Sequence, residues 1–218
     1  MNVLVVNTTH PQLAVPAFYS IVPGAHFRER SMGTSVGMFT AKLITEKYPP
    51  QLAIQQLFEF DDLLPGKYYI KFYLGQCYQT LGDLHKAIAT YTQALDLEPT
   101  SEDIPSIYAF LGECYKDTED YLMALDVLKK GCEYDDERPD IYNLMGFCYF
   151  KLKEHHDAIA CFENVIKLNP GSAIDYANIA SNYRDLQNKE KAIEYYEKAL
   201  SIDPTIDFAR DNLLKLLS

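Results

Sequence analysis

The sequence predicts an all-α fold, an α-solenoid of helix-turn-helix repeats that stack on one another. Three short segments share one pattern: residues 74–78, 111–115 and 145–149 read LGQCY, LGECY and MGFCY. The glycine of the second segment precedes that of the third by 34 residues, and Ala180 follows a further 34 residues on. A unit of this size cannot bury its apolar face alone, so neighbouring units must stack.

Two more positions recur in every unit. A second small residue lies twelve residues after the first, and a large apolar residue lies four residues later; these are Ala87, Ala124, Ala158 and Ala192, then Tyr91, Leu128, Phe162 and Tyr196. Helical periodicity on both sides of a short polar turn predicts two packed helices. We expect the small residues of the two helices to face each other where the helices cross. A proline then ends the second helix at Pro99, Pro170 and Pro204.

This pattern resembles the tetratricopeptide repeat (TPR), a 34-residue unit with Gly or Ala, Tyr, Ala, an aromatic residue and Pro at fixed offsets. The resemblance covers residues 68–101, 105–138, 139–172 and 173–206. It departs at Lys71, where an aromatic residue is usual, at Asp136, which replaces the proline, and at residues 102–104, a three-residue insertion. The resemblance implies a curved array whose concave face binds protein segments.

The flanks of the array predict further elements. Residues 34–67 read as a degenerate TPR-like repeat, with Ala41, Ala53, Leu57 and Pro65 at the repeat positions and helices at about 40–46 and 51–63. Residues 207–218 predict a capping helix with a polar outer face.

The irregular apolar N-terminal segment, residues 1–33, does not fit the repeat. Residues 3–6 suggest a short strand, and residues 14–22 suggest a short helix or an extended segment between prolines. We expect this segment to cover the first helix pair, to enter the groove of its own array, or to dock onto another copy.

Charge and cysteine content exclude several classes of protein. The 218 residues carry 20 Lys+Arg and 31 Asp+Glu, a net charge of -11, which argues against a nucleic-acid partner and against an anionic membrane surface. No Lys or Arg precedes Arg28, and prolines interrupt every early apolar run, so we expect neither a signal peptide nor membrane insertion. Five cysteines without a CxxC pair favour a reducing, cytoplasmic location.

No catalytic motif is present in the sequence, so we expect a non-enzymatic protein with no cofactor and no metal. His155 and His156 fall in a turn, where polar residues are ordinary. The recurrent cysteines, Cys77, Cys114 and Cys148, suit a small buried position better than redox chemistry. The acidic pair at residues 61–62 reads as a solvated helix end.

The TPR resemblance implies which residues line the groove. Positions 2, 5, 9 and 12 of each first helix commonly contact ligands. The candidate partner-binding residues chosen from these positions and from the cap are Tyr69, Phe72, Gln76, Gln79, Ala109, Glu113, Lys116, Asn143, Phe147, Phe150, Ala177, Ser181, Arg184 and Phe208. Neither the Lys-Asn-Asn-Lys-Arg clamp for a C-terminal carboxylate nor an asparagine ladder is matched.

These features favour an adaptor or scaffold that holds a protein or peptide partner in the concave groove. One alternative is a self-associating scaffold that uses residues 1–33 or the first repeat, similar to magnetosome-associated TPR scaffolds that build homo-oligomers. Another is a secretion-type chaperone for an apolar client, although such chaperones usually have three repeats. Exposed aromatic residues in a groove are typical interface anchors.

Overall fold

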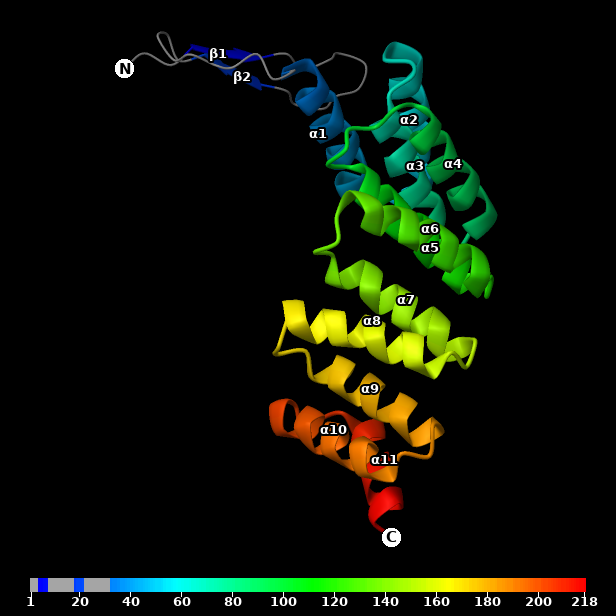
Figure 1. Ribbon diagram of the computed structural model, residues 1–218. Helices are drawn as coiled ribbons and strands as arrows, with labels where there is room; N and C mark the ends of the chain where they lie inside the picture. The colour runs from blue at the N-terminus through cyan, green and yellow to red at the C-terminus, as the bar shows by residue number, and fades with distance from the viewer. Residues whose placement is uncertain (1–3, 8–17, 22–31) are drawn as a thin grey trace. The chain divides into compact units, whose positions relative to one another are not determined.

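The computed structural model describes residues 4–7, 18–21 and 32–218, and it divides into two compact units, residues 1–100 and 101–218. The described residues contain eleven helices and one pair of short strands (Figure 1). The predicted α-solenoid of TPR helix pairs is confirmed, with the strand pair as an addition to it. No helix in the described part of the chain is long and apolar enough to cross a bilayer.

The first unit begins with an antiparallel ribbon. Strand β1 (Leu4–Asn7) pairs with β2 (Phe18–Ile21), and Leu4 lies opposite Ile21. β1 agrees with the strand expected at residues 3–6, and β2 shows that the described part of residues 14–22 is extended. The predicted docking of residues 1–33 lies mostly outside the described residues.

Four helices complete the first unit: α1 (Met32–Lys47), α2 (Pro50–Leu63), α3 (Tyr68–Thr80) and α4 (Leu84–Asp96). α1 is longer than the expected helix at 40–46, since it begins at Met32. A side chain at Gly37 would collide with the Tyr69 hydroxyl, so the glycine lets α1 lie close to α3. The Tyr69 ring is 1% exposed as a result.

An ion pair joins α2 to α3 in this unit. Lys71 Nζ donates to Asp61 Oδ2 over 2.6 Å, and both side chains are about one-fifth exposed, at 20% and 21%. The sequence-based interpretation of Asp61 as part of a solvated helix end is therefore wrong. The same contact explains why a lysine stands where the repeat usually has an aromatic residue.

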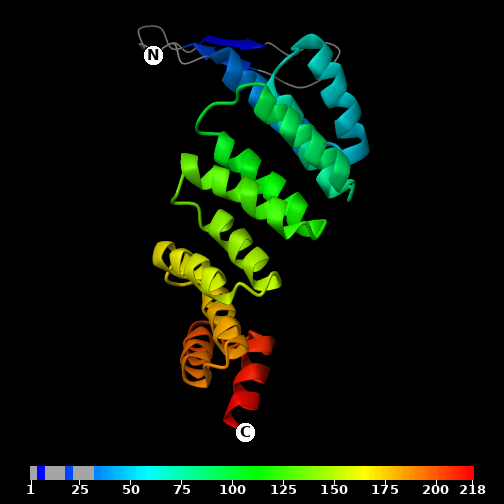
Figure 2. The ribbon, with the colours of Figure 1, turned by 45° about the vertical axis from the view of Figure 1, so that its right-hand side comes forward.

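The second unit consists of seven helices that follow one another in space as in sequence (Figures 1 and 2). They are α5 (Ile104–Asp117), α6 (Tyr121–Tyr134), α7 (Pro139–Lys151), α8 (His155–Leu168), α9 (Ala173–Asp185), α10 (Lys189–Ile202) and α11 (Asp207–Leu217). How the chain divides into repeats remains a prediction.

The turn inside each of the pairs α3–α4, α5–α6, α7–α8 and α9–α10 has one conformation. A residue in the left-handed region ends the first helix: Gly82 in the first unit, then Glu119, Lys153 and Gln187. The next backbone N–H bonds back to the carbonyl of a repeat tyrosine over 2.9 Å, as from Asp120 to Tyr115. This is the Schellman arrangement, which satisfies the last carbonyls of a helix.

Glycine in the first helix packs against the large residue of the second helix. That the small residues of the two helices also face each other remains a prediction. A Cβ added at Gly75 would lie 2.5 Å from the Tyr91 ring, and one at Gly146 would lie 2.7 Å from Phe162. The large side chain thus fills the space that the missing Cβ leaves. The small residues that follow, such as Ala87 and Ala158, are fully buried.

The last helix differs from the expected cap in its surface. Leu214 and Leu217 of α11 are 60% and 59% exposed. The predicted polar outer face is therefore interrupted by apolar side chains. Ala209 on the same helix is buried against the preceding pair.

Candidate functional site

Two adjoining pockets in the second unit form the candidate site, and we call them together the groove. The first, the acidic pocket, has a volume of about 510 Å³ and lies over α5, α7, the end of α8 and the start of α9. It is lined by Ala109, Phe110, Glu113, Pro139, Asp140, Asn143, Leu144, Val165, Asn169, Ser172, Ile174 and Asp175.

The second, the aromatic pocket, has a volume of about 320 Å³ and lies over α7, α8, α9 and α11. It is lined by Asn143, Phe147, Phe150, Phe162, Asn178, Ser181, Asn182, Arg184, Phe208 and Asn212. Asn143 lines both pockets, so the two adjoin at this residue.

A buried carboxylate stands in the wall of the acidic pocket. Asp175 is 2% exposed and accepts hydrogen bonds from Asn143 Nδ2 and Ser172 Oγ, each over 2.6 Å. Desolvation raises the pKa of this carboxyl, while its hydrogen-bond donors act in the opposite direction. Neutral donors satisfy the carboxylate, and they tie α7 to α9.

Asp140 is the exposed acid of the same pocket. Arg138 donates to it from Nε over 2.9 Å and from Nη2 over 2.7 Å, a bidentate contact. Burial raises the pKa of Asp140, but the hydrogen bonds and charge of Arg138 outweigh this effect and lower it. The twelve residues that line the pocket include three acids and no Lys or Arg. The pocket therefore has a negative lining.

Four phenylalanines and four asparagines are among the ten residues that line the aromatic pocket. Phe147 and Phe208 are each 39% exposed, whereas Phe162 is buried beneath the helix pair. Lys116 and Lys151 place their Nζ atoms 5.6 and 5.3 Å from the centre of the Phe147 ring. Exposed rings in a concave site are available for contact with an apolar side chain.

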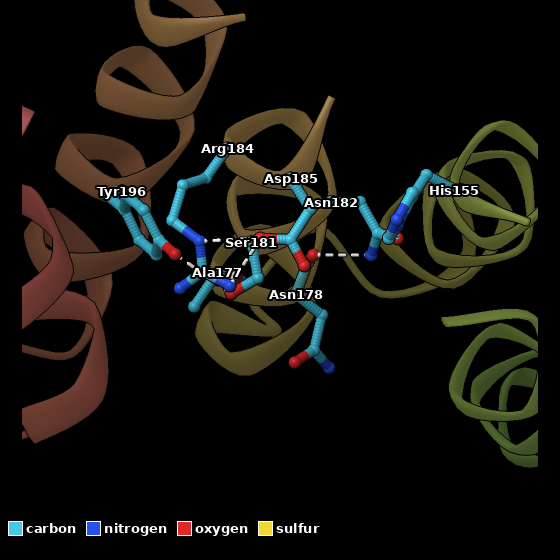
Figure 3. Close-up of polar contacts among 8 residues, drawn as sticks. All are labelled: His155, Ala177, Asn178, Ser181, Asn182, Arg184, Asp185 and Tyr196. Carbon is cyan, nitrogen blue, oxygen red and sulfur yellow. Dashed lines mark hydrogen bonds and ion pairs between the residues drawn. The ribbon is translucent and has the colours of Figure 1, made fainter. Parts of the chain in front are cut away.

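Hydrogen bonds fix the polar floor of the aromatic pocket, and they are drawn in Figure 3. The buried Asn182 donates from Nδ2 to the Asn178 carbonyl over 2.8 Å, and its Oδ1 lies 3.0 Å from His155 Nδ1. On the other side, Ser181 Oγ lies 2.9 Å from the Tyr196 hydroxyl. This network links α8, α9 and α10, so the floor is held by side chains from three helices.

The structure brings together eight of the candidate residues around the groove: Ala109, Glu113, Asn143, Phe147, Phe150, Ser181, Arg184 and Phe208. Lys116 lies beside them over the Phe147 ring. Ala177 is fully buried, so its side chain is not available to a partner.

The remaining four candidates belong to the first unit. Tyr69 is in the core, which contradicts its expected place on a binding surface; Gly37 leaves the space that its ring fills. Gln79 accepts a hydrogen bond from the Tyr91 hydroxyl over 2.9 Å. Phe72 packs at 5.9 Å from the same Tyr91 ring, and Gln76 is partly buried nearby on α3.

Sequence reasoning missed Asp175 and Asn182. Both are polar residues on α9 that are almost fully buried, at 2% and 1% exposed. In the sequence, Asp175 lies in the first turn of a helix, where an acidic residue usually serves to complement the helix dipole. The sequence carries no signal that its carboxylate turns toward α7.

The described residues contain no metal-binding cluster, and four of the five cysteines are buried. No group of three or more His, Cys, Asp or Glu is placed there to hold a metal ion. Burial raises the pKa of Cys77 and Cys148 to about 11 and that of Cys114 and Cys161 to about 12. These thiols are protonated at neutral pH and pack as small apolar groups.

Comparison with relatives of known sequence gives partial matches. A 147-residue stretch is 26% identical to anaphase-promoting complex subunit CDC16 of Saccharomyces cerevisiae, covering 64% of this chain and 17% of that protein. A 122-residue stretch is 28% identical to anaphase-promoting complex subunit 6 of Arabidopsis thaliana, covering 54% of this chain and 22% of that protein. The chain thus spans about a fifth of the length of these relatives.

Solved structures share the fold. YrrB, described as a TPR protein with an unusual peptide-binding site, superposes with a TM-score of 0.71 at 20% identity over 81% of this chain and 89% of its own. MamA superposes with a TM-score of 0.70 at 23% identity over 79% of this chain and 94% of its own. At these identities the likeness concerns the fold alone.

Family models match most of the helical array. Two tetratricopeptide repeat models match residues 68–101 and 137–205, and a model of anaphase-promoting complex (cyclosome) subunit 3 matches residues 98–165. Together they span residues 68–205. The repeated helix pairs, their glycine-to-aromatic packing and these matches agree, and the chain belongs to the tetratricopeptide repeat family.

Proposed function

We propose that this protein is a non-enzymatic adaptor or scaffold that holds a segment of a partner protein in the groove of its second unit. The observation that carries the proposal is the pair of adjoining pockets, which present Phe147 and Phe208 beside polar side chains. Exposed aromatic residues in a concave, partly desolvated site are the usual anchors of protein recognition. Similarity to subunits of the anaphase-promoting complex supports a role in a protein assembly.

The shape of the groove favours a peptide-like ligand over a compact small molecule. The two pockets meet at Asn143 and extend from α5 to α11, so a ligand that fills both must be elongated. Polar groups such as Asn178 and Asn212 lie among the rings, and carboxamides can bond both N–H and C=O groups of a main chain.

A peptide-display selection on the full chain tests this function. Random peptides are selected against the wild-type protein, and the recovered peptides are then measured by fluorescence anisotropy against a Phe147→Ala/Phe208→Ala variant. We expect the variant to weaken binding at least tenfold, because truncating an aromatic anchor costs about 2 kcal/mol or more.

The matched control is Leu122→Ala on α6, which removes an apolar side chain that is 68% exposed and outside the groove. It should bind the peptides as the wild type does. Circular dichroism checks that both variants keep their helices. Recovery of no peptide, or equal binding by the Phe147→Ala/Phe208→Ala variant, would contradict the proposed groove.

Self-association through the first repeat is a second candidate, because α1 and α2 expose large apolar side chains. Phe39 is 59% exposed and Phe58 is 47% exposed. Light scattering of the wild type against a Phe39→Ser/Phe58→Ser variant tests it. A dimer mass that the variant reduces to a monomer supports this candidate, and a monomer mass for the wild type removes it.

A further inference from the structure

We infer that the groove takes an extended segment carrying a Lys or Arg for the acidic pocket and a large apolar residue, about three positions away, for the aromatic pocket. This inference rests on the proposed function and specifies the chemistry of its partner. The partner is a segment of another protein.

Charge complementarity selects the basic residue. The acidic pocket presents Asp140 on its surface and Asp175 in its wall, with Glu113 on the facing helix. Arg138 engages Asp140, yet the Asp140 side chain remains 51% exposed. A Lys or Arg side chain entering this pocket meets carboxylates, whereas an acidic side chain would meet like charges.

The apolar residue is selected by the other pocket. Its phenylalanines offer ring faces and edges, and no Asp or Glu is among the ten residues that line it. Arg184 is the one cation of that lining, and its Nε donates to Asp185 over 2.8 Å. A Leu, Met or aromatic side chain is therefore favoured there over a charged one.

The distance between the pockets sets the spacing. Asp140 and Phe147 lie seven residues apart on α7, which corresponds to about 10 Å along the helix axis. An extended chain rises about 3.3 Å per residue, so about three residues span this distance.

Asn143 favours an extended rather than a helical segment. A carboxylate can only accept hydrogen bonds, so the carboxamide of Asn143 turns its Nδ2 toward Asp175 on α9 and donates to it. Oδ1 is therefore the end of the carboxamide that faces away from Asp175. Among the described residues Asn143 Oδ1 accepts no hydrogen bond, and the residue lines both pockets. Oδ1 is thus placed to accept a main-chain N–H of the ligand, and such groups are unpaired in an extended chain. Asp175 acts here as a positioning residue.

The composition of the peptides selected by display on the full chain provides the first test. We expect enrichment of Lys or Arg two to four positions from a large apolar residue. Enriched peptides without a basic residue, or with Asp or Glu at that position, would overturn the inference and leave the proposed function standing. A selection that recovers no peptide overturns both.

A double-mutant cycle provides the second test and assigns the contact. One selected peptide and its Lys→Gln counterpart are titrated against the wild type and against Asp140→Asn. We expect the peptide change Lys→Gln alone, and the protein change Asp140→Asn alone, each to weaken binding about two- to fivefold. Making both changes together should weaken binding little more than either one alone. Additive losses, or no loss, would show that the basic residue lies elsewhere.

Two further variants test whether the loss of affinity comes from the contact with Asp140 and from the Asn143 acceptor, or from a change anywhere in the protein. Glu197→Gln on α10 removes an exposed acid outside the groove and should leave the affinity unchanged. Asn143→Leu keeps the approximate size of the side chain but removes the acceptor Oδ1 together with the Nδ2 donor to Asp175. It should weaken wild-type peptide more than a peptide N-methylated at the contacted amide. Equal weakening of both peptides would contradict the role of the Asn143 acceptor.

Discussion

Asn143 of α7 donates a hydrogen bond from Nδ2 to Oδ1 of the buried Asp175 of α9 over 2.6 Å. The contact joins two helices through residues that lie 32 positions apart in sequence, and it lies where the two pockets adjoin. A buried carboxylate that no cation neutralises is costly, so its donors must remain in place for the wall to keep its shape.

The stability contribution of Asp175 should therefore depend on pH. Burial raises the pKa of this carboxyl in the folded state above its ordinary value of 3.8. Below that value the group is neutral in both states, and its favourable contribution is fully present. As the pH rises through the folded-state pKa, the contribution is lost, because ionisation is easier in the unfolded chain.

Asp175→Asn removes this dependence, since an amide does not titrate. We expect the free energy of unfolding of the wild type, relative to Asp175→Asn, to fall as the pH rises from about 3 to about 7. Urea unfolding followed by circular dichroism at several pH values measures it. A difference that is constant or that grows with pH would contradict the raised pKa.

Gly146 has no room for a side chain. A Cβ there would lie 2.7 Å from the Phe162 ring, so Gly146→Ala should overpack the helix pair. Overpacking costs about 1–3 kcal/mol and exceeds the gain of about 1 kcal/mol in helix propensity. Thermal unfolding should show a lower midpoint for this variant. Gly171→Ala is the control, because its nearest neighbour would be 3.6 Å away, and it should change stability by less than about 0.5 kcal/mol.

The helices of the array could be predicted from the sequence because their signals are local. Glycine at a fixed offset, a polar turn and an apolar period each report on neighbouring residues in the chain. Which side chain of the second helix packs against the glycine of the first could not be predicted in the same way. That Gly146 packs against the Phe162 ring depends on how far one helix is rotated about its axis relative to the next.

The groove was predicted in part for a related reason. Phe147 and Phe208 follow from the repeat positions, and the structure places both around one pocket. Asp175 and the burial of Tyr69 depend on contacts between helices that are distant in sequence. A family pattern indicates the face on which a residue lies, but it does not indicate whether a neighbouring helix covers that residue.

Lys71 should stabilise the first unit through Asp61 rather than through its own burial. Asp61 Oδ1 is buried without a hydrogen-bond partner in the described residues, and Oδ2 depends on Lys71. Lys71→Met should therefore cost about 1–2 kcal/mol, allowing for the partial exposure of the pair. Chemical denaturation of the full chain measures the change.

The second substitution Asp61→Leu should restore most of that loss, because it removes the unpaired carboxylate. Lys86→Met is the control, since Lys86 pairs with Asp83 at a far more exposed position. It should show no comparable loss. A Lys71→Met/Asp61→Leu variant no more stable than Lys71→Met would mean that the lysine stem, not its charge, supports the contact.

The five thiols should differ sharply in reactivity at pH 8. Reaction with Ellman's reagent requires the thiolate, and a pKa of about 11 or 12 leaves almost none at Cys77, Cys114, Cys148 and Cys161. Cys132 is only partly buried, so it should react first, with the other four modified as fast as global unfolding allows. A Cys132→Ser variant should lose the fast phase alone. Two or more fast-reacting thiols in the native wild type would show that a helix pair opens locally. In that case, added urea should change the rate of the slow phase alone, as long as the other helix pairs stay closed.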